Sequence, residues 1–153
     1  MSQLADIYAA LAAISVTAAG KTPSVYLPDA LPASLPTALL PCRLLQTLGT
    51  PLSAQSSGAL ALGGGQVQRW RLTDLLVWAP TGQGRGPAEH SGALVAYCAA
   101  YAGAVGVGRA LDTAASRATV VDVQFEPGVF EVPKASGSRY YGVACTVTVE
   151  EIA

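Results

Sequence analysis

Charged side chains are scarce in this chain of 153 residues. Asp, Glu, Lys and Arg make up 12% of it, against about 25% in a typical soluble domain. Alanine explains part of the 51% hydrophobic share without making a surface greasy. Buried subunit interfaces explain the rest, because a nearly uncharged free surface would promote association. The composition therefore favours a protein that assembles with other chains.

The chain also lacks any concentration of basic residues. Its formal net charge is −1, and its lysines and arginines are scattered. This disfavours sequence-independent binding of nucleic acid, which needs many phosphate contacts. No apolar run approaches the length of a membrane span, and residues 1–16 lack the basic region of a secretory signal. We expect neither binding to nucleic acid nor association with a membrane.

Cysteine and histidine are too few to suggest a disulfide framework or a metal site. Cys42, Cys98 and Cys145 are odd in number, far apart and without a C-x-x-C pair. Each lies in an apolar pattern, which is typical of a buried free thiol. His90 is the only histidine, and no carboxylates stand near it at ligand spacing. We expect no metal and no cofactor.

What is present predicts one α+β domain over residues 1–153, with a mostly antiparallel sheet, two helices packed on one face, and long loops. Helical spacing predicts the first helix over residues 2–16 and the second over 87–105. The first presents Leu4, Ile7, Tyr8, Leu11 and Ile14. The second presents Leu94, Cys98, Tyr101 and Val105, with Val95 and Tyr97 beside them.

The segment between the first helix and the middle of the chain is rich in proline and small residues. Prolines punctuate residues 21–45 and predict extended chain. Ala38–Leu48 is predicted as an edge strand because it contains Pro41. The Gly-, Ser- and Ala-rich stretch 49–66 predicts a long flexible loop.

Period-2 patterns predict the remaining strands. Trp70, Leu72, Leu76 and Trp78 share one strand face, and Asp74 interrupts it, which suggests a bulge or a strand end facing a partner. The last third predicts strands in which the residues of one face alternate with polar or small residues of the other. One such face holds Thr119, Val121, Val123 and Phe125, and a later one holds every second residue from Tyr141 to Val149. Glu126–Val129 has the signature of a type II turn, and residues 133–139 read as a loop.

The stretch "TGQGRGPAEH", residues 81–90, looks at first like a phosphate cradle. Gly82 and Gly84 begin a G-x-G-x-x-G pattern, but Pro87 occupies its last position, and no P-loop lysine is present. A small phosphate-ligand binder or enzyme using residues 82–87, with Arg85 as the cation, stays an alternative. His90 has neighbours on other helix faces and no nucleophile at a useful spacing. No active site assembles, so we expect no enzyme.

Several segments together resemble a known family. The chain contains "LADIYAALAAI", "LPASLPTALLPCRLL", "WRLTDLLVWAPTGQGRG", "LVAYCAAYAGAV" and "RYYGVACTVTVEE" in that order. This arrangement is similar to tail terminator or tail-completion (neck) proteins of long-tailed bacteriophages. The resemblance implies a structural, homo-oligomeric ring, commonly a hexamer, which caps the tail tube and joins it to the head connector. Another neck layer, head completion, shares this general build.

The resemblance also implies a location and a set of partners. The protein would be made in the host cytoplasm and reside in the virion, at the neck of the tail. Its partners would be its own copies, the tail tube protein and the neck proteins, with DNA passing the lumen without specific binding. We expect subunit docking through polar side chains on strands and loops: Arg69, Arg71, Gln83, Arg85, His90, Lys134 and Arg139.

Overall fold

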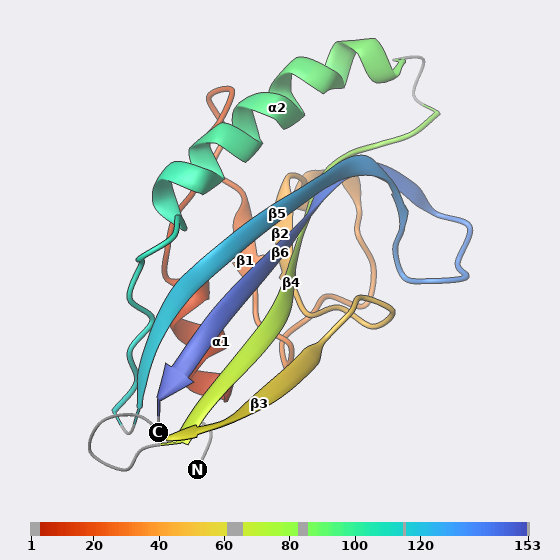
Figure 1. Ribbon diagram of the computed structural model, residues 1–153. Helices are drawn as coiled ribbons and strands as arrows, with labels where there is room; N and C mark the ends of the chain where they lie inside the picture. Colours follow the sequence, from red (N-terminus) through yellow and green to blue (C-terminus); the bar gives the residue numbers. More distant parts are fainter. Residues whose placement is uncertain (1–3, 61–65, 83–85, 115, 153) are drawn as a thin grey trace.

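A computed structural model describes residues 4–60, 66–82, 86–114 and 116–152 (Figure 1). The elements are α1 (Leu4–Ala12), β1 (Ser24–Tyr26), a 3₁₀ turn (Thr37–Leu39), β2 (Cys42–Leu45), β3 (Ser53–Leu60), β4 (Gln66–Pro80), α2 (Pro87–Ala104), β5 (Arg117–Glu131) and β6 (Arg139–Ile152). The predicted α+β class is confirmed. No helix in the described part of the chain is long and apolar enough to cross a membrane.

β4 is the centre of a mixed, mostly antiparallel sheet. The strand order is β1-β2-β4-β6-β5, and β3 pairs with β4 on the same side as β2. β3 and β2 therefore lie end to end along β4, opposite residues 66–71 and 74–77 respectively. Among the described strand pairs, only β1–β2 is parallel. The long β4–β6–β5 ladder is the frame on which the rest of the chain packs.

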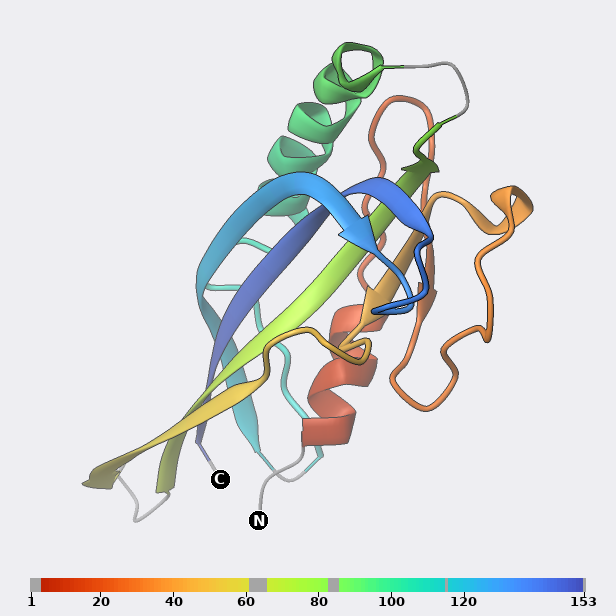
Figure 2. The same cartoon turned by 90° about the vertical axis from the view of Figure 1, so that its right-hand side faces the viewer.

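Both helices pack on the same face of this sheet, as predicted (Figure 2). The sheet side of this core includes Leu72, Leu76 and Trp78 of β4, with Trp70 packed against its edge. Alternate residues of β6, from Tyr141 to Val149, complete it. The helices contribute Ile7, Tyr8 and Leu11 from α1 and Leu94, Tyr97 and Tyr101 from α2.

A smaller core lies on the opposite face, under the proline-rich segment. Leu35 packs there with Leu44, Val77 and Tyr140, and the Tyr140 hydroxyl donates to the Leu35 carbonyl oxygen at 3.1 Å. Prolines prevent this segment from forming a helix, so it lies across the sheet as extended chain. Each large apolar side chain buried in either core contributes about 1.5–3 kcal/mol.

Three predictions made from local sequence pattern are wrong. β2 is internal rather than an edge strand, because β1 pairs with its outer side and Pro41 precedes the strand. The predicted loop at 49–66 contains β3, which is held by backbone pairing with β4. Residues 61–65 of the predicted loop lie outside the described part of the chain. α1 ends at Ala12 instead of 16, since Ile14 and Val16 enter the core beyond the helix.

The turn predicted at Glu126–Val129 is also wrong. β5 runs without interruption through Pro127 and Gly128, and the hairpin turns at residues 133–138 instead, where the Val132 N–H donates to the Ser138 carbonyl. The ladder shifts register between Val120 and Asp122. This bulge reverses which face of the sheet successive side chains point to. Ala118 and Val120 are therefore buried before it, whereas Thr119, predicted to share a face with Val123 and Phe125, is exposed.

Asp74 is neither at a bulge nor at a strand end. It pairs in register with Leu45 and Cys145 and is completely buried. Its Oδ2 accepts hydrogen bonds from Arg43 Nη2 at 2.6 Å and from the Tyr101 hydroxyl at 2.8 Å. The carboxylate of Asp74 thus joins the centre of β4 to β2 through a buried ion pair and to α2 through a hydrogen bond.

Arg43 also ends the first helix. Its Nη1 donates to the Ile14 carbonyl at 2.6 Å and its Nη2 to the Leu11 carbonyl at 3.4 Å, which also accepts from the Ile14 N–H at 3.2 Å. Both carbonyls lie at or just beyond the C-terminal end of α1, where backbone acceptors need partners from outside the helix. Burial lowers the pKa of Arg43, but the charge and hydrogen bonds of Asp74 raise it more, so its net pKa is above the ordinary value. The guanidinium stays charged inside the core.

Candidate docking surface

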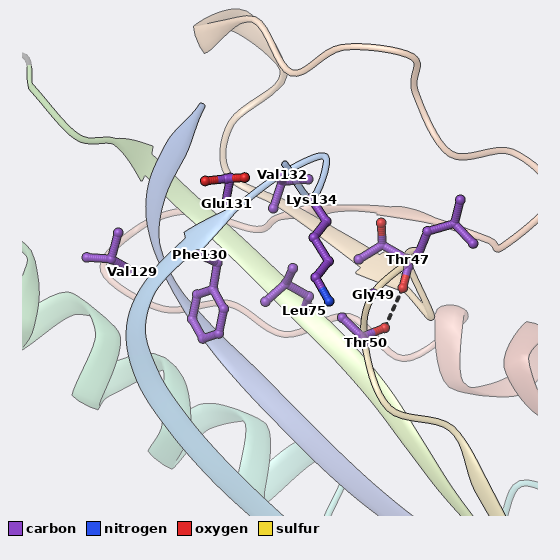
Figure 3. Close-up of a pocket in the computed structure, with 10 residues that line it drawn as sticks. Thr47, Gly49, Thr50, Leu75, Val129, Phe130, Glu131, Val132 and Lys134 are labelled. Atoms are coloured by element: carbon purple, nitrogen blue, oxygen red, sulfur yellow. Dashed lines mark hydrogen bonds between the residues drawn. The ribbon is translucent and has the colours of Figure 1, made fainter. Parts of the chain in front are cut away.

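One hollow lies between the turn after β2 and the tip of the β5–β6 hairpin (Figure 3). Its volume is about 270 Å³. Leu75 of β4 forms the floor, Phe130 and Val129 form one wall, and Thr47 and Thr50 form the other. The Lys134 side chain reaches across from the hairpin toward Thr50.

Two further hollows share lining residues with this one. A hollow of about 220 Å³ between α2 and β5 shares Val129, and another of about 170 Å³ beside the proline-rich segment shares Leu48. We call the three together the docking trough. Along it Leu48 is 89% exposed, Val95 64% and Val129 51%. The hollow between α2 and β5 lies on the helix face of the sheet and the other two lie on the opposite face, so the trough passes around the edge strand β5. Exposed apolar residues grouped in this way make the trough a candidate interaction site.

The turn that forms one wall of the trough is firmly held. Gln46, at a φ of 54°, points its amide nitrogen at the Thr50 and Pro51 carbonyls, 3.0 and 2.9 Å away. Its amide oxygen accepts from the Tyr8 hydroxyl and the Thr73 N–H. The wall is therefore fixed before any partner binds, which lowers the ordering cost of association.

A glycine lets the lysine lie across this wall. Gly49 has a φ of 89°, which favours glycine, and a Cβ there would lie 2.8 Å from Lys134 Cδ. The aliphatic stem of Lys134 packs on this bare backbone while its ammonium group stays at the rim. The trough thus combines a largely apolar lining with the ammonium group of Lys134.

The predicted docking residues fall into two groups. Lys134 lines the trough, and His90 stacks on Tyr141 at a ring distance of 5.0 Å beside it. Arg139 is exposed at the same end of the sheet, where its carbonyl accepts from the Thr81 N–H.

Arg69 and Arg71 lie far along β4 from this group, opposite β3. Both are exposed, and Arg69 Nε donates to Glu150 at 3.0 Å. Gln83 and Arg85, the two remaining predicted docking residues, lie outside the described part of the chain.

Sequence reasoning missed the apolar residues of the trough. It placed Val95 beside the buried helix face, whereas the structure points it outward. Leu48 ends the segment predicted as an edge strand, and Val129 ends the predicted turn, so neither was expected to be an exposed apolar contact residue. Their common signal was solvent exposure, which only the assembled fold reveals.

The three thiols differ in access, which allows a direct test of the fold. Burial raises the pKa of Cys42 to about 12, and burial together with the charge of Asp74 raises that of Cys145 well above its ordinary value. Cys98 is only partly buried. Because the thiolate is the reactive form, we expect a thiol reagent at pH 8 to modify Cys98 first.

Mass spectrometry of the native protein during labelling measures this order. Cys42 and Cys145 should react only after unfolding, and Cys98→Ala should abolish the early phase. Early modification of Cys42 in the native protein would contradict the burial of β2.

The structure is that of an α+β domain whose surface carries the trough. Comparison with known proteins yields no matching family model, no matching curated protein and no matching solved structure.

Proposed function

We propose that this protein is a structural subunit of a ring at the head–tail junction of a long-tailed bacteriophage, which caps the tail tube and joins it to the head connector. The resemblance of the sequence to tail terminator and tail-completion proteins supports this proposal. The segments that carry the resemblance form α1, the 3₁₀ turn with β2, β4, α2 and β6. They make up most of the main core.

The observation that carries the proposal is the presence of two unlike surfaces at different places on one small domain. The docking trough is apolar, with Leu48, Val95 and Val129 exposed. The far part of β4 instead presents Arg69 and Arg71 beside the small polar residues of β3. A closed ring needs such a heterologous contact, in which one patch of a subunit meets a different patch of the next.

In this role the protein has its own copies, the tail tube protein and the connector or other neck proteins as partners. The ring commonly has six subunits in the family that the sequence resembles. The net charge of −1 suits a lumen through which DNA passes without being gripped. The function is structural, and the protein would reside in the virion after synthesis in the host cytoplasm.

The experiment that tests the proposal is assembly of the purified protein with and without purified tail tubes. Mass measurement in solution and negative-stain images should show rings, free or seated on tube ends, at micromolar protein. Connector complexes should bind the tube only when the ring is present. A monomer that ignores both tube and connector would refute the proposal.

The docking trough gives a second test within the same assay. Leu48→Asp or Val95→Asp should weaken ring formation or tube attachment by tenfold or more, because burial of each side chain contributes about 1.5–3 kcal/mol and tenfold corresponds to 1.4 kcal/mol. Val107→Asp is the matched control, since Val107 is 73% exposed but does not line the trough. Equal loss in the control would mean that the trough is not the docking surface.

A further inference from the structure

Two of the open borders of the sheet carry features that block the addition of another strand. β1 is three residues long and lies between Pro23 and Pro28. The segment at residues 108–109 covers the first part of β5. There the Val120 N–H donates to the Arg109 carbonyl at 2.9 Å, and the Gly108 N–H donates to the Val120 carbonyl at 2.8 Å. Edge strands are commonly protected by short length, by cover or by proline.

β3 has none of these protections. Ser53–Leu60 contains no proline and no charged residue, and the side chains of residues 53–56 are exposed. Its ladder partner in the described chain is β4, and neither view shows another helix or strand drawn along its outer edge (Figures 1 and 2). An unprotected edge of this kind is a template for strand addition.

The register shows which backbone groups of β5 are open. Val120 directs its N–H and C=O outward, away from β6. The bulge after Val120 reverses the alternation, so Val123 and Phe125 direct theirs outward, while Asp122, opposite Thr148, faces β6. Pro127, two residues after Phe125, has no N–H to donate. The open stretch of β5 is therefore short and bounded, at residues 122–126.

The same reasoning applies to β3. The Thr73 carbonyl accepts from the Gln46 N–H, so odd residues of β4 direct their backbone groups toward β2 and β3. Ser53, opposite Arg71, therefore bonds inward to β4, and Ala54 directs its N–H and C=O outward. β3 thus presents free backbone groups at alternate residues over a length that matches the open stretch of β5.

Strand direction makes these two edges compatible in a ring. The joins β3–β4, β4–β6 and β6–β5 are all antiparallel, so the four strands alternate in direction. When a second copy is added in the same orientation, its β3 lies antiparallel to the β5 of the first. Each added copy repeats this heterologous contact, which is the geometry of a cyclic assembly.

We propose that residues 53–56 of β3 pair with residues 123–126 of β5 in a neighbouring copy of this chain, with Ser53 opposite Glu126. The proposal rests on the proposed function, because it requires self-assembly, and it adds the joint by which copies meet. The sheet then continues from one subunit into the next through main-chain hydrogen bonds.

Charge favours this register. Glu126 and Arg71 are both exposed and lie on the sheet face away from the helices, as the cross-strand partners of each show. In the joint, Ser53 is the only residue between them. Two strand spacings separate their backbones by about 9.6 Å, which an arginine and a glutamate side chain bridge over a short serine.

Cysteine cross-linking tests the register. Ser53 and Glu126 would form a non-hydrogen-bonded antiparallel pair, whose Cα atoms stand about 4.5 Å apart, within disulfide range. In a Cys98→Ala background, oxidised Ser53→Cys/Glu126→Cys protein should give a ladder of covalent oligomers up to the closed ring. Ser53→Cys/Gln124→Cys, offset by two residues, and each single variant should not.

A proline substitution tests the backbone contact itself. Ala54→Pro removes an outward N–H and no bond to β4, so the subunit should keep its fold and its unfolding transition. Ring assembly should require about tenfold more protein or greater, the effect of losing one or two net hydrogen bonds at each joint. Ala54→Thr keeps the N–H and should assemble normally.

The outcomes separate this joint from the ring itself. Rings that form without the Ser53–Glu126 link and tolerate Ala54→Pro would overturn the joint and leave the proposed function standing. Dimers linked between two Ser53→Cys residues would also overturn it, by showing twofold pairing of β3. A chain that stays monomeric at every concentration, even with tail tubes, would overturn both proposals.

Discussion

Replacing Asp74 by leucine is expected to lower the free energy of unfolding by about 3–5 kcal/mol. The substitution keeps a similar volume but leaves the guanidinium of Arg43 buried without its counter-charge. It also removes the acceptor of the Tyr101 hydroxyl. Since a domain of this size is stable by about 5–15 kcal/mol, a large share of the stability would be lost.

Arg43→Met should cost about the same, for a matching reason. It leaves the carboxylate of Asp74 buried beside a single hydroxyl donor, and it removes the guanidinium donor from the Ile14 carbonyl, while the Leu11 carbonyl keeps its bond from the Ile14 N–H. The double variant Arg43→Met/Asp74→Leu removes both charges together. Its loss should be well below the sum of the two single losses, because neither charge is then left unpaired.

Chemical unfolding at one fixed protein concentration measures this cycle, with Trp70 and Trp78 as fluorescent reporters near the core. Fixed concentration matters because self-assembly would itself add to the apparent stability. Arg69→Met provides the control, since the Arg69–Glu150 pair is exposed and should be worth at most about 1 kcal/mol. Strictly additive losses in the cycle would show that the buried pair is not coupled.

The elements with strong periodicity could be predicted from the sequence. α2 and β6 bury residues at their characteristic spacings, and the structure gives both nearly the expected bounds. The placement of both helices on one face followed from each having one apolar stripe. These are cases in which local pattern and tertiary packing agree.

The elements that failed are those in which a distant partner outweighs the local signal. β3 has few strand-forming residues, and its ladder to β4 makes it a strand. Pro127 and Gly128 carry a turn signature, but the long β6 ladder holds them extended, and Pro127 is tolerated because β5 is an edge strand. Asp74 read as an interruption because its partner Arg43 is 31 residues away.

The candidate docking surface was predictable only in part. Lys134 and His90, which lie in and beside the trough, were predicted as docking residues because charged and aromatic residues on loops and helix starts are conspicuous in a sequence poor in charge. The trough beside them depends on which apolar side chains the fold leaves outside, and on hollows formed by segments about 80 residues apart, such as Gly49 and Lys134. Sequence spacing carries no information about that contact.

Gly142→Ala should be the most damaging single-methyl addition in the sheet. Gly142 lies in β6 opposite Val77, beside the register shift of β4, where the backbone of Leu76 comes unusually close. A Cβ at this position would lie 2.0 Å from the Leu76 carbonyl oxygen. No side-chain rotation relieves a clash with backbone, so the β4–β6 ladder itself must shift.

The expected loss is about 3 kcal/mol or more, at or above the upper end of ordinary overpacking costs. Gly128→Ala is the matched control, because Gly128 faces Gly142 directly across the β5–β6 ladder. A Cβ there meets nothing closer than 3.9 Å, so its effect should stay within about 0.5 kcal/mol. Equal unfolding midpoints for the two variants would contradict the close approach of β4 and β6. The position of the hairpin tip, and therefore of the docking trough, depends on that approach.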